Sequence, residues 1–91
     1  MSSHKHLVEA VSSLPKSKIF VTFTDGKARI YDVGALVDKI PAFERLCSNQ
    51  DLFYKSRPER SGLAVIWDDY FDLASDEIYL NGAETPESKA A

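Results

Sequence analysis

The sequence predicts an α+β domain with a mostly antiparallel sheet, and three observations support this fold class. Residues 18–33 alternate between apolar and mixed side chains around Asp25-Gly26, which is the pattern of a β-hairpin. Residues 63–67, LAVIW, are continuously apolar, which is typical of a strand buried on both faces. Helical spacing lies between these segments, so strands and helices are grouped along the chain, and this grouping favours antiparallel pairing. The expected order is strand, hairpin, two short helices, two strands and a terminal helical turn.

The size and charge of the chain indicate one small soluble domain. It has 91 residues and a net charge of −3. We expect the domain to occupy residues 6–82, with polar tails at 1–5 and 83–91. The single cysteine cannot form an internal disulfide, and no apolar run suits a signal peptide or a membrane span. These features favour a cytoplasmic protein, monomeric or homodimeric, that does not contact a membrane.

The hairpin has a register that its turn residues predict. Asp25-Gly26 suits a two-residue type I′ turn, which would pair Phe23 with Ala28 and Phe20 with Tyr31. Side chains alternate across a strand, so this register separates two faces. The expected core face holds Ile19, Val21, Phe23, Ala28 and Ile30. The expected mixed face holds Phe20, Thr22, Thr24, Lys27, Arg29 and Tyr31.

The elements next to the hairpin follow from proline positions and capping residues. A first strand is expected over residues 6–13, ended by Pro15, because proline cannot donate to a sheet. After the hairpin, Asp32 suits the N-cap of a helix over residues 33–40. Pro41 ends that helix, because the residue before a proline avoids the helical conformation.

The second half of the chain is expected to hold two short helices, two strands and a last helical turn. The helices cover residues 42–47 and 49–55, the second capped by Ser48, and residues 63–67 form the centre of the sheet. A further short strand covers residues 71–73. Ser75 is the expected N-cap of a turn over residues 76–80, which Asn81-Gly82 closes.

Trp67 has two interpretations. Its continuity with the apolar run before it favours a buried ring whose indole N–H finds a partner near the following turn. The alternative is an exposed anchor of a protein interface, where tryptophan is enriched.

Three motifs make the chain resemble domain-of-unknown-function family 2442, a group of small bacterial proteins. They are the hairpin VTFTDGKARIYDV, the DLF at residues 51–53, and VIWDDYFDLASDEIY near the end. The resemblance runs from Leu7 to Tyr79, although Asp68-Asp69-Tyr70 stands where many members have Pro-Asn-Gly. It implies no established activity. It implies a small partner encoded beside toxin-like or uncharacterised genes, without the helix-turn-helix module of longer members.

Residues that could carry chemistry are few. Cys47 would need a histidine within reach to act as a nucleophile, and His4 and His6 lie near the N-terminus. We interpret Cys47 as a buried or half-buried thiol and the two histidines as incidental rather than a metal site. The four glycines lie too far apart for a phosphate loop, and no cofactor is expected. The acidic residues lack EF-hand spacing and are interpreted as structural or solvated, with weak Ca²⁺ or Mg²⁺ binding as the alternative: Asp68, Asp69, Asp72, Asp76 and Glu77.

The mixed face of the hairpin is the expected surface for another protein. Its aromatic residues could instead be covered by the first helix or by Trp67. The candidate partner-binding residues are Phe20, Thr22, Lys27, Arg29, Tyr31 and Arg57.

Three classes of function remain open at this point. The leading hypothesis is a non-enzymatic protein-interaction or regulatory module, such as the neutralising, antitoxin-like partner of a neighbouring protein. The second is a nucleic-acid-binding transcriptional regulator, in which basic residues including Lys55, Arg57 and Arg60 meet phosphates and aromatic rings stack on bases. The third is an uncharacterised enzyme, which would need a concave site holding Cys47 or the acidic residues.

Overall fold

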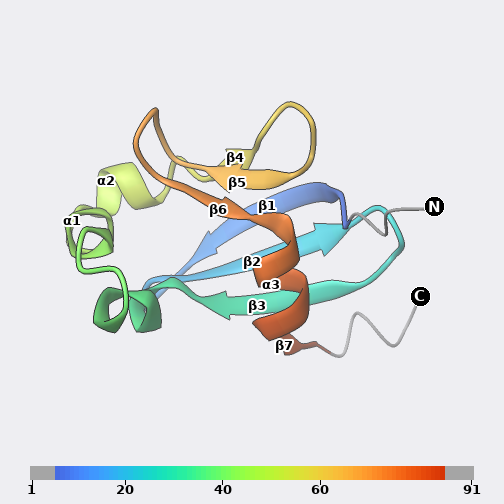
Figure 1. Ribbon diagram of the computed structural model, residues 1–91, viewed down its shortest axis with the longest axis horizontal. Coiled ribbons are helices and arrows are strands. Elements are labelled where there is room, and N and C mark those ends of the chain that lie inside the picture. The colour runs from blue at the N-terminus through green and yellow to red at the C-terminus, as the bar shows by residue number, and fades with distance from the viewer. Residues whose placement is uncertain (1–5, 86–91) are drawn as a thin grey trace.

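The computed structural model describes residues 6–85, which form two antiparallel sheets and several short helices (Figure 1). The larger sheet has the strand order β1-β2-β3-β7, with β1 (Val8–Leu14), β2 (Lys18–Phe23), β3 (Ala28–Asp32) and β7 (Ala83–Glu84). The smaller sheet has the order β4-β5-β6, with β4 (Arg57–Pro58), β5 (Ala64–Ile66) and β6 (Asp72–Ala74). The predicted α+β class with a mostly antiparallel sheet is therefore confirmed.

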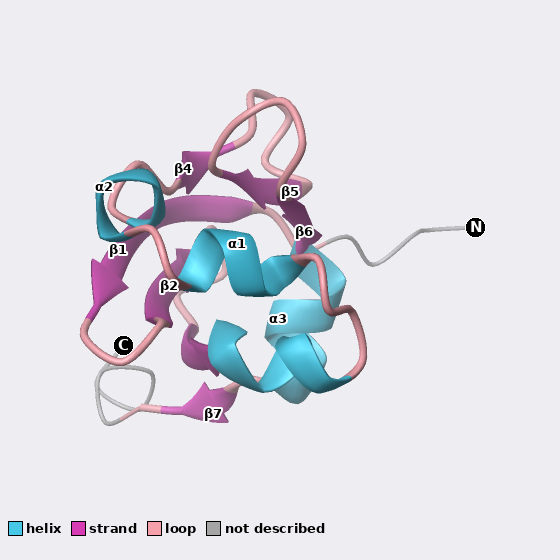
Figure 2. Cartoon of the chain, turned by 90° about the vertical axis from the view of Figure 1, so that its left-hand side faces the viewer, coloured by secondary structure: helices cyan, strands magenta, loops and turns pink. Residues whose placement is uncertain are grey.

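The helices are short and lie in two places. They are the 3₁₀-helix η1 (Val33–Asp38) and the α-helices α1 (Phe43–Cys47), α2 (Gln50–Phe53) and α3 (Ser75–Asn81). Figure 2 looks at the end of the molecule where η1, α1 and α2 gather. By contrast, α3 packs on β3, in front of the larger sheet in the view of Figure 1. None of the helices within residues 6–85 is long and apolar enough to span a membrane.

The two sheets meet along β1. The Val8 N–H donates to the Gly62 carbonyl at 2.7 Å, beside one end of β1. Near the other end, the Ser13 hydroxyl bonds the Phe53 carbonyl at 2.8 Å and the Ser56 hydroxyl at 2.6 Å. The backbone from residue 53 to residue 62 therefore runs alongside β1. The smaller sheet thus packs next to the first strand of the larger one.

The hairpin loop contains one residue more than the sequence predicted. The Phe23 N–H donates to the Lys27 carbonyl at 2.9 Å, so the loop is Thr24-Asp25-Gly26. Gly26 has a φ of 90°, whereas among the described non-glycine residues only Lys16 and Ser17 have positive φ. The prediction of a two-residue type I′ turn is therefore wrong. The loop is of the three-residue kind, in which glycine takes the left-handed position at the end.

The longer loop shifts the pairing of β3 by one residue and changes which side chains share a face. The pairs are Ile19–Tyr31, Phe20–Ile30, Val21–Arg29 and Thr22–Ala28. Arg29 and Tyr31 therefore lie on the core face, where both are buried, and the predicted mixed face is wrong for these two residues. Ile30 takes a place opposite Phe20 on the other face and is only half-buried.

The predicted strand and helix near the hairpin are present with shifted bounds. The first strand ends before Pro15 as expected, although it begins at Val8. The Asp32 carboxylate caps η1 by accepting from the Ala35 N–H at 3.2 Å, which confirms the N-cap. The helix is 3₁₀ and ends at Asp38, so Ile40 lies beyond it and is 45% exposed rather than turned inward.

The cap of α2 and the place of the apolar strand also differ from expectation. Asn49, not Ser48, caps α2 by accepting from the Leu52 N–H at 3.2 Å. The apolar run forms β5, which is the middle strand of the smaller sheet rather than the centre of the main one. Its first residue, Leu63, is 38% exposed, whereas Val65 is fully buried.

The end of the folded chain departs from the predicted capping. Ser75 is the first residue of α3, and Ala74 takes the N-cap position instead, without a side-chain capping bond. Gly82 has a φ of −74°, so it ends the helix in an extended conformation rather than a left-handed one. A Cβ at Gly82 would lie 2.6 Å from the Ile78 carbonyl oxygen and 3.0 Å from the Arg29 Cβ. Glycine is thus required there because the chain passes close to both the Ile78 carbonyl of α3 and the Arg29 side chain of β3.

The ordered fold extends past the expected boundary at residue 82. Ala83 and Glu84 pair with Ile30 and Arg29 as β7, and Thr85 is buried. The tail expected at residues 1–5 and the last part of the tail expected at 83–91 lie outside the described residues.

Trp67 is a core residue, which confirms the expected burial of its ring, although its indole N–H donates to α2 rather than to a partner near the following turn. Only 1% of its surface is exposed, and its ring packs on that of Phe53 at a centroid distance of 5.9 Å. Its indole N–H donates to the Phe53 carbonyl at 3.0 Å. The only tryptophan of the chain therefore ties the smaller sheet to the helical end of the molecule.

We expect Gly26→Val to destabilise the domain because a β-branched side chain is strained at positive φ. The loss in the free energy of unfolding should be about 1–3 kcal/mol, measured by chemical denaturation. Gly26→Asn is the matched control, since asparagine tolerates this region better and should cost less. Equal losses from the two variants would contradict the left-handed conformation of the loop.

A second prediction concerns Trp67. The fluorescence of the folded protein should be blue-shifted, and Trp67→Ala should lower the free energy of unfolding by about 3–5 kcal/mol. Tyr70→Ala is the control, because Tyr70 is 88% exposed, and it should change stability by no more than about 0.5 kcal/mol. Red-shifted emission from the folded wild type would contradict the burial of this ring.

Candidate functional site

A groove of about 610 Å³ lies between η1 and α3. This volume is within the range of about 300–1,000 Å³ that is usual for ligand sites. Its lining comes from two stretches that are far apart in the sequence, residues 31–43 on β3, η1 and α1 and residues 72–81 on β6 and α3. The lining residues are Tyr31, Asp32, Ala35, Leu36, Lys39, Ile40, Phe43, Asp72, Leu73, Ala74, Glu77 and Asn81.

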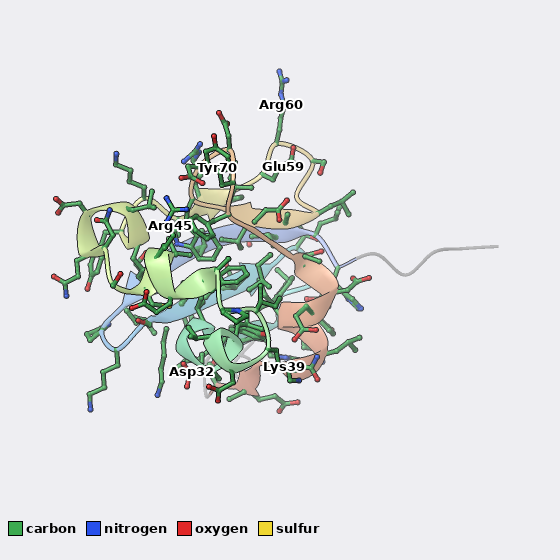
Figure 3. All side chains as sticks on the ribbon, turned by 60° about the vertical axis from the view of Figure 1, so that its left-hand side comes forward. Asp32, Lys39, Arg45, Glu59, Arg60 and Tyr70 are labelled. Atoms are coloured by element: carbon green, nitrogen blue, oxygen red, sulfur yellow. The ribbon has the colours of Figure 1, made fainter. Side chains whose placement is uncertain are left out.

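The groove combines apolar surface with charged groups. Leu36, Phe43 and Leu73 are buried core residues that reach its lining, and the half-exposed Ile40 adds further apolar surface. Three carboxylates, those of Asp32, Asp72 and Glu77, share the lining with one ammonium, that of Lys39. Figure 3 shows Asp32 and Lys39 on the same side of the molecule, away from Glu59, Arg60 and Tyr70. The groove therefore has an excess of negative charge.

Glu77 is the most constrained polar group of the groove. The Tyr31 hydroxyl donates to its Oε2 at 2.7 Å, and the Asn81 amide donates to its Oε1 at 3.0 Å. Burial, together with the hydrogen bond to Glu77 and the charge of that carboxylate, raises the pKa of Tyr31 far above its usual value. The phenol thus stays protonated and keeps donating, which holds the Glu77 carboxylate in one orientation.

A second cluster fixes the other side of α3. The Arg29 guanidinium lies 4.6 Å from the centroid of the Tyr79 ring and donates through Nε to the Tyr79 carbonyl at 3.0 Å. The ring also stacks on His6, with centroids 3.6 Å apart, and meets Phe23 edge-on at 4.9 Å. Its hydroxyl donates to Asp25 in the hairpin loop at 2.8 Å. These contacts place α3, and with it Glu77, relative to the sheet.

The titration of Asp25 reflects its place in this cluster. Slight burial would raise its pKa, but hydrogen bonds from the Lys27 backbone and the Tyr79 hydroxyl outweigh this and lower it. The carboxylate is therefore held charged against the end of α3.

The structure does not bring the six candidate partner-binding residues into one surface. Arg29 and Tyr31 are buried on the core face beneath α3. Phe20 and Thr22 lie half-buried on the opposite face of the sheet. The remaining two are exposed elsewhere: Lys27 at the end of the hairpin, and Arg57 on β4. Only Tyr31 belongs to the groove.

This arrangement also separates the basic residues considered for nucleic acid. The Arg29 guanidinium is used inside the molecule, where it donates to the carbonyls of Tyr79 and Ala28. Arg57 donates to the Trp67 carbonyl at 3.3 Å, which fixes it against the smaller sheet. Arg29 and Tyr31 are both buried, so they do not serve as an exposed cation and stacking ring in the nucleic-acid alternative.

The acidic residues near the C-terminus have several roles. The Asp68 carboxylate accepts from the backbone N–H groups of Tyr70 and Phe71 at 2.8 and 2.9 Å, so it closes the turn between β5 and β6. Asp72 and Glu77 line the groove, whereas Asp69 and Asp76 are exposed. Within residues 6–85, no three His, Cys, Asp or Glu side chains are arranged to hold a metal ion.

Cys47 lies outside the groove, beside a smaller pocket of about 120 Å³. It is half-buried, as expected, and burial raises the pKa of its thiol, which makes it a weaker nucleophile. His6 stacks on Tyr79 and does not approach this cysteine's pocket. His4 lies outside the described residues.

Sequence reasoning missed the groove and most of the residues that form it. The sequence predicts for Glu77 only a structural or solvated role, with weak cation binding as the alternative, and it assigns no functional role to Lys39 or Asn81. The Tyr31–Glu77 bond joins residues 46 positions apart, and nothing local in the sequence marks that distance. One signal is available in the sequence: Ile40 directly precedes Pro41 and so avoids the helical conformation, which could have ended the helix before it.

Comparison with known proteins gives one match. The model of a family described as "Protein of unknown function (DUF2442)" matches residues 8–84. The chain belongs to this family. The match begins with β1 and ends with β7, so it covers both sheets and α3. No curated protein and no solved structure matches the chain.

The raised pKa of Tyr31 leads to a pH prediction. Tyr31→Phe should cost about 1 kcal/mol of stability near neutral pH, because it removes the bond to Glu77. An unfolded tyrosine ionises near pH 10 while the folded Tyr31 does not, so the contribution of Tyr31 is complete below that pH and is lost as pH rises above it. The gap between wild type and variant should then narrow by up to about 1.4 kcal/mol per pH unit.

The measurement is urea denaturation of both proteins over a series of pH values on either side of pH 10. Comparing the two proteins cancels the titration of the other tyrosines. Wild-type and variant stabilities that fall in parallel through this range would contradict the bond between Tyr31 and Glu77.

Proposed function

We propose that this protein is a small non-enzymatic regulatory module that acts by binding a segment of a partner protein in the groove between η1 and α3. The observation that carries the proposal is the groove itself. The groove is large for so small a domain. Its lining combines apolar surface with charged groups that can orient a ligand. By occupying a functional segment of its partner, the module would block that segment. This is how an antitoxin-like protein would neutralise the protein encoded beside it.

The chemistry of the lining supports binding over catalysis. The Tyr31 proton is held by Glu77, and the raised pKa of the phenol makes it a poor general acid or base near neutral pH. Cys47 does not line the groove, and His6 is packed on Tyr79. Residues 6–85 therefore assemble no nucleophile activated by histidine at this site.

The setting of this function is part of the same proposal. The family resemblance is to small bacterial proteins, and a chain with a single cysteine suits a reducing compartment. We place the interaction in the bacterial cytoplasm, with the module acting as a monomer or homodimer.

A variant that fills the groove tests the proposal. Ala35 is exposed and lines the groove, so Ala35→Trp should block it without disturbing the core. Ala10→Trp makes the same change at an exposed position on β1 that is not part of the groove. Immobilised wild type and Ala10→Trp should capture the same protein from a lysate of the source organism at near-stoichiometric yield, and Ala35→Trp should lose it.

If wild type captures nothing that Ala35→Trp fails to capture, the groove is not the binding surface. Circular dichroism and thermal melting of the three proteins establish that each is folded before the comparison.

A further inference from the structure

The hydrogen bonds around Glu77 leave part of its carboxylate free to receive a ligand. Each carboxylate oxygen can accept about two hydrogen bonds. Oε2 receives one from Tyr31 and Oε1 receives one from Asn81. One acceptor position on each oxygen therefore remains, on a carboxylate whose orientation these two bonds set.

This free pair of acceptors matches one side chain better than any other. Arginine presents two parallel N–H groups that bind both oxygens of a carboxylate, whereas the lysine ammonium acts as a point charge. The orientation imposed by Tyr31 and Asn81 lowers the entropy cost of such a bond, because Glu77 has little rotamer freedom left to lose.

The rest of the lining agrees with a cationic and apolar ligand. Asp32 and Asp72 add negative charge around the same groove, against the single positive charge of Lys39. This excess would repel an acidic segment and attract a basic one. Leu36, Ile40 and Leu73 offer apolar surface beside the charges, which a purely polar ligand would leave uncovered.

From these contacts we infer that the groove binds a partner segment in which an arginine is adjacent to aliphatic or aromatic residues. The guanidinium pairs with both oxygens of Glu77, and the apolar neighbours cover Leu36, Ile40 and Leu73. This inference rests on the proposed function, since it assumes that a protein segment occupies the groove. Glu77 is then the specificity-determining residue, and Tyr31 and Asn81 are positioning residues.

The probe is a phage-displayed library of random peptides, selected on immobilised wild-type protein. Selected peptides should carry arginine next to leucine, isoleucine or phenylalanine, and they should fail to bind Ala35→Trp. For the best peptide, replacing arginine by citrulline, its uncharged isostere, should weaken binding about tenfold or more, since a charged hydrogen bond is lost. Replacing it by lysine should give a smaller loss.

Matched variants of the protein locate the effect. Glu77→Gln should weaken binding of the arginine peptide about tenfold or more, and it should bind the citrulline peptide as the wild type does. Asp76→Asn removes the same charge from the neighbouring exposed residue, which does not line the groove, and should leave binding unchanged. Tyr31→Phe keeps the charge of Glu77 but loses its orientation, so it should weaken binding less than Glu77→Gln does.

The possible failures are distinguishable. If no peptide is selected, or if those selected bind Ala35→Trp as well as wild type, the proposed function itself is wrong. Should peptides require the open groove but lack a cation, the groove binds a segment and the arginine inference is overturned. Equal effects of Glu77→Gln and Asp76→Asn would also overturn it, because the contribution would then be general charge rather than a bond to Glu77.

Discussion

The register of the β2–β3 hairpin is the constraint on which the rest of this structure depends. A loop of three residues, closed by Gly26 at a φ of 90°, places Arg29 opposite Val21 and Tyr31 opposite Ile19. A shift of one residue would turn both polar side chains to the other face of the sheet. The partners of α3 would then be missing, because that helix bonds to these two side chains and packs against them.

Two buried polar residues of β3 explain how α3, near the end of the sequence, is held on the sheet formed mainly by its first half. Arg29 stacks on Tyr79 and bonds its carbonyl, and Tyr31 donates to Glu77. Within residues 6–85, no buried side-chain nitrogen or oxygen lacks a hydrogen-bond partner. Such complete pairing is what makes polar groups acceptable in a small core, where an unpaired one costs more than the bond contributes.

The bond between Tyr31 and Glu77 contributes both to the stability of the fold and to the shape of the groove. Glu77 stabilises the fold through Tyr31 and, at the same time, lines the groove between η1 and α3. The family match covers all the elements that build this arrangement, although it names no activity. Membership of the family therefore leaves the function open, and the groove shows where in this fold a ligand has room to bind.

Local patterns in the sequence determined the fold class, the first strand, the N-cap at Asp32, the burial of Trp67 and the family. Each of these depends on neighbouring residues or on a continuous apolar run. Tertiary structure alone decided the hairpin register, because Asp25-Gly26 fits two loop lengths and the apolar pattern favoured the other one. The observed register is stabilised by α3, which lies about 50 residues further along the chain. Its Tyr79 carbonyl and Glu77 carboxylate accept hydrogen bonds from Arg29 and Tyr31 on the core face. The groove depends on this register, since its lining includes Tyr31 of β3 together with residues of η1 and α3.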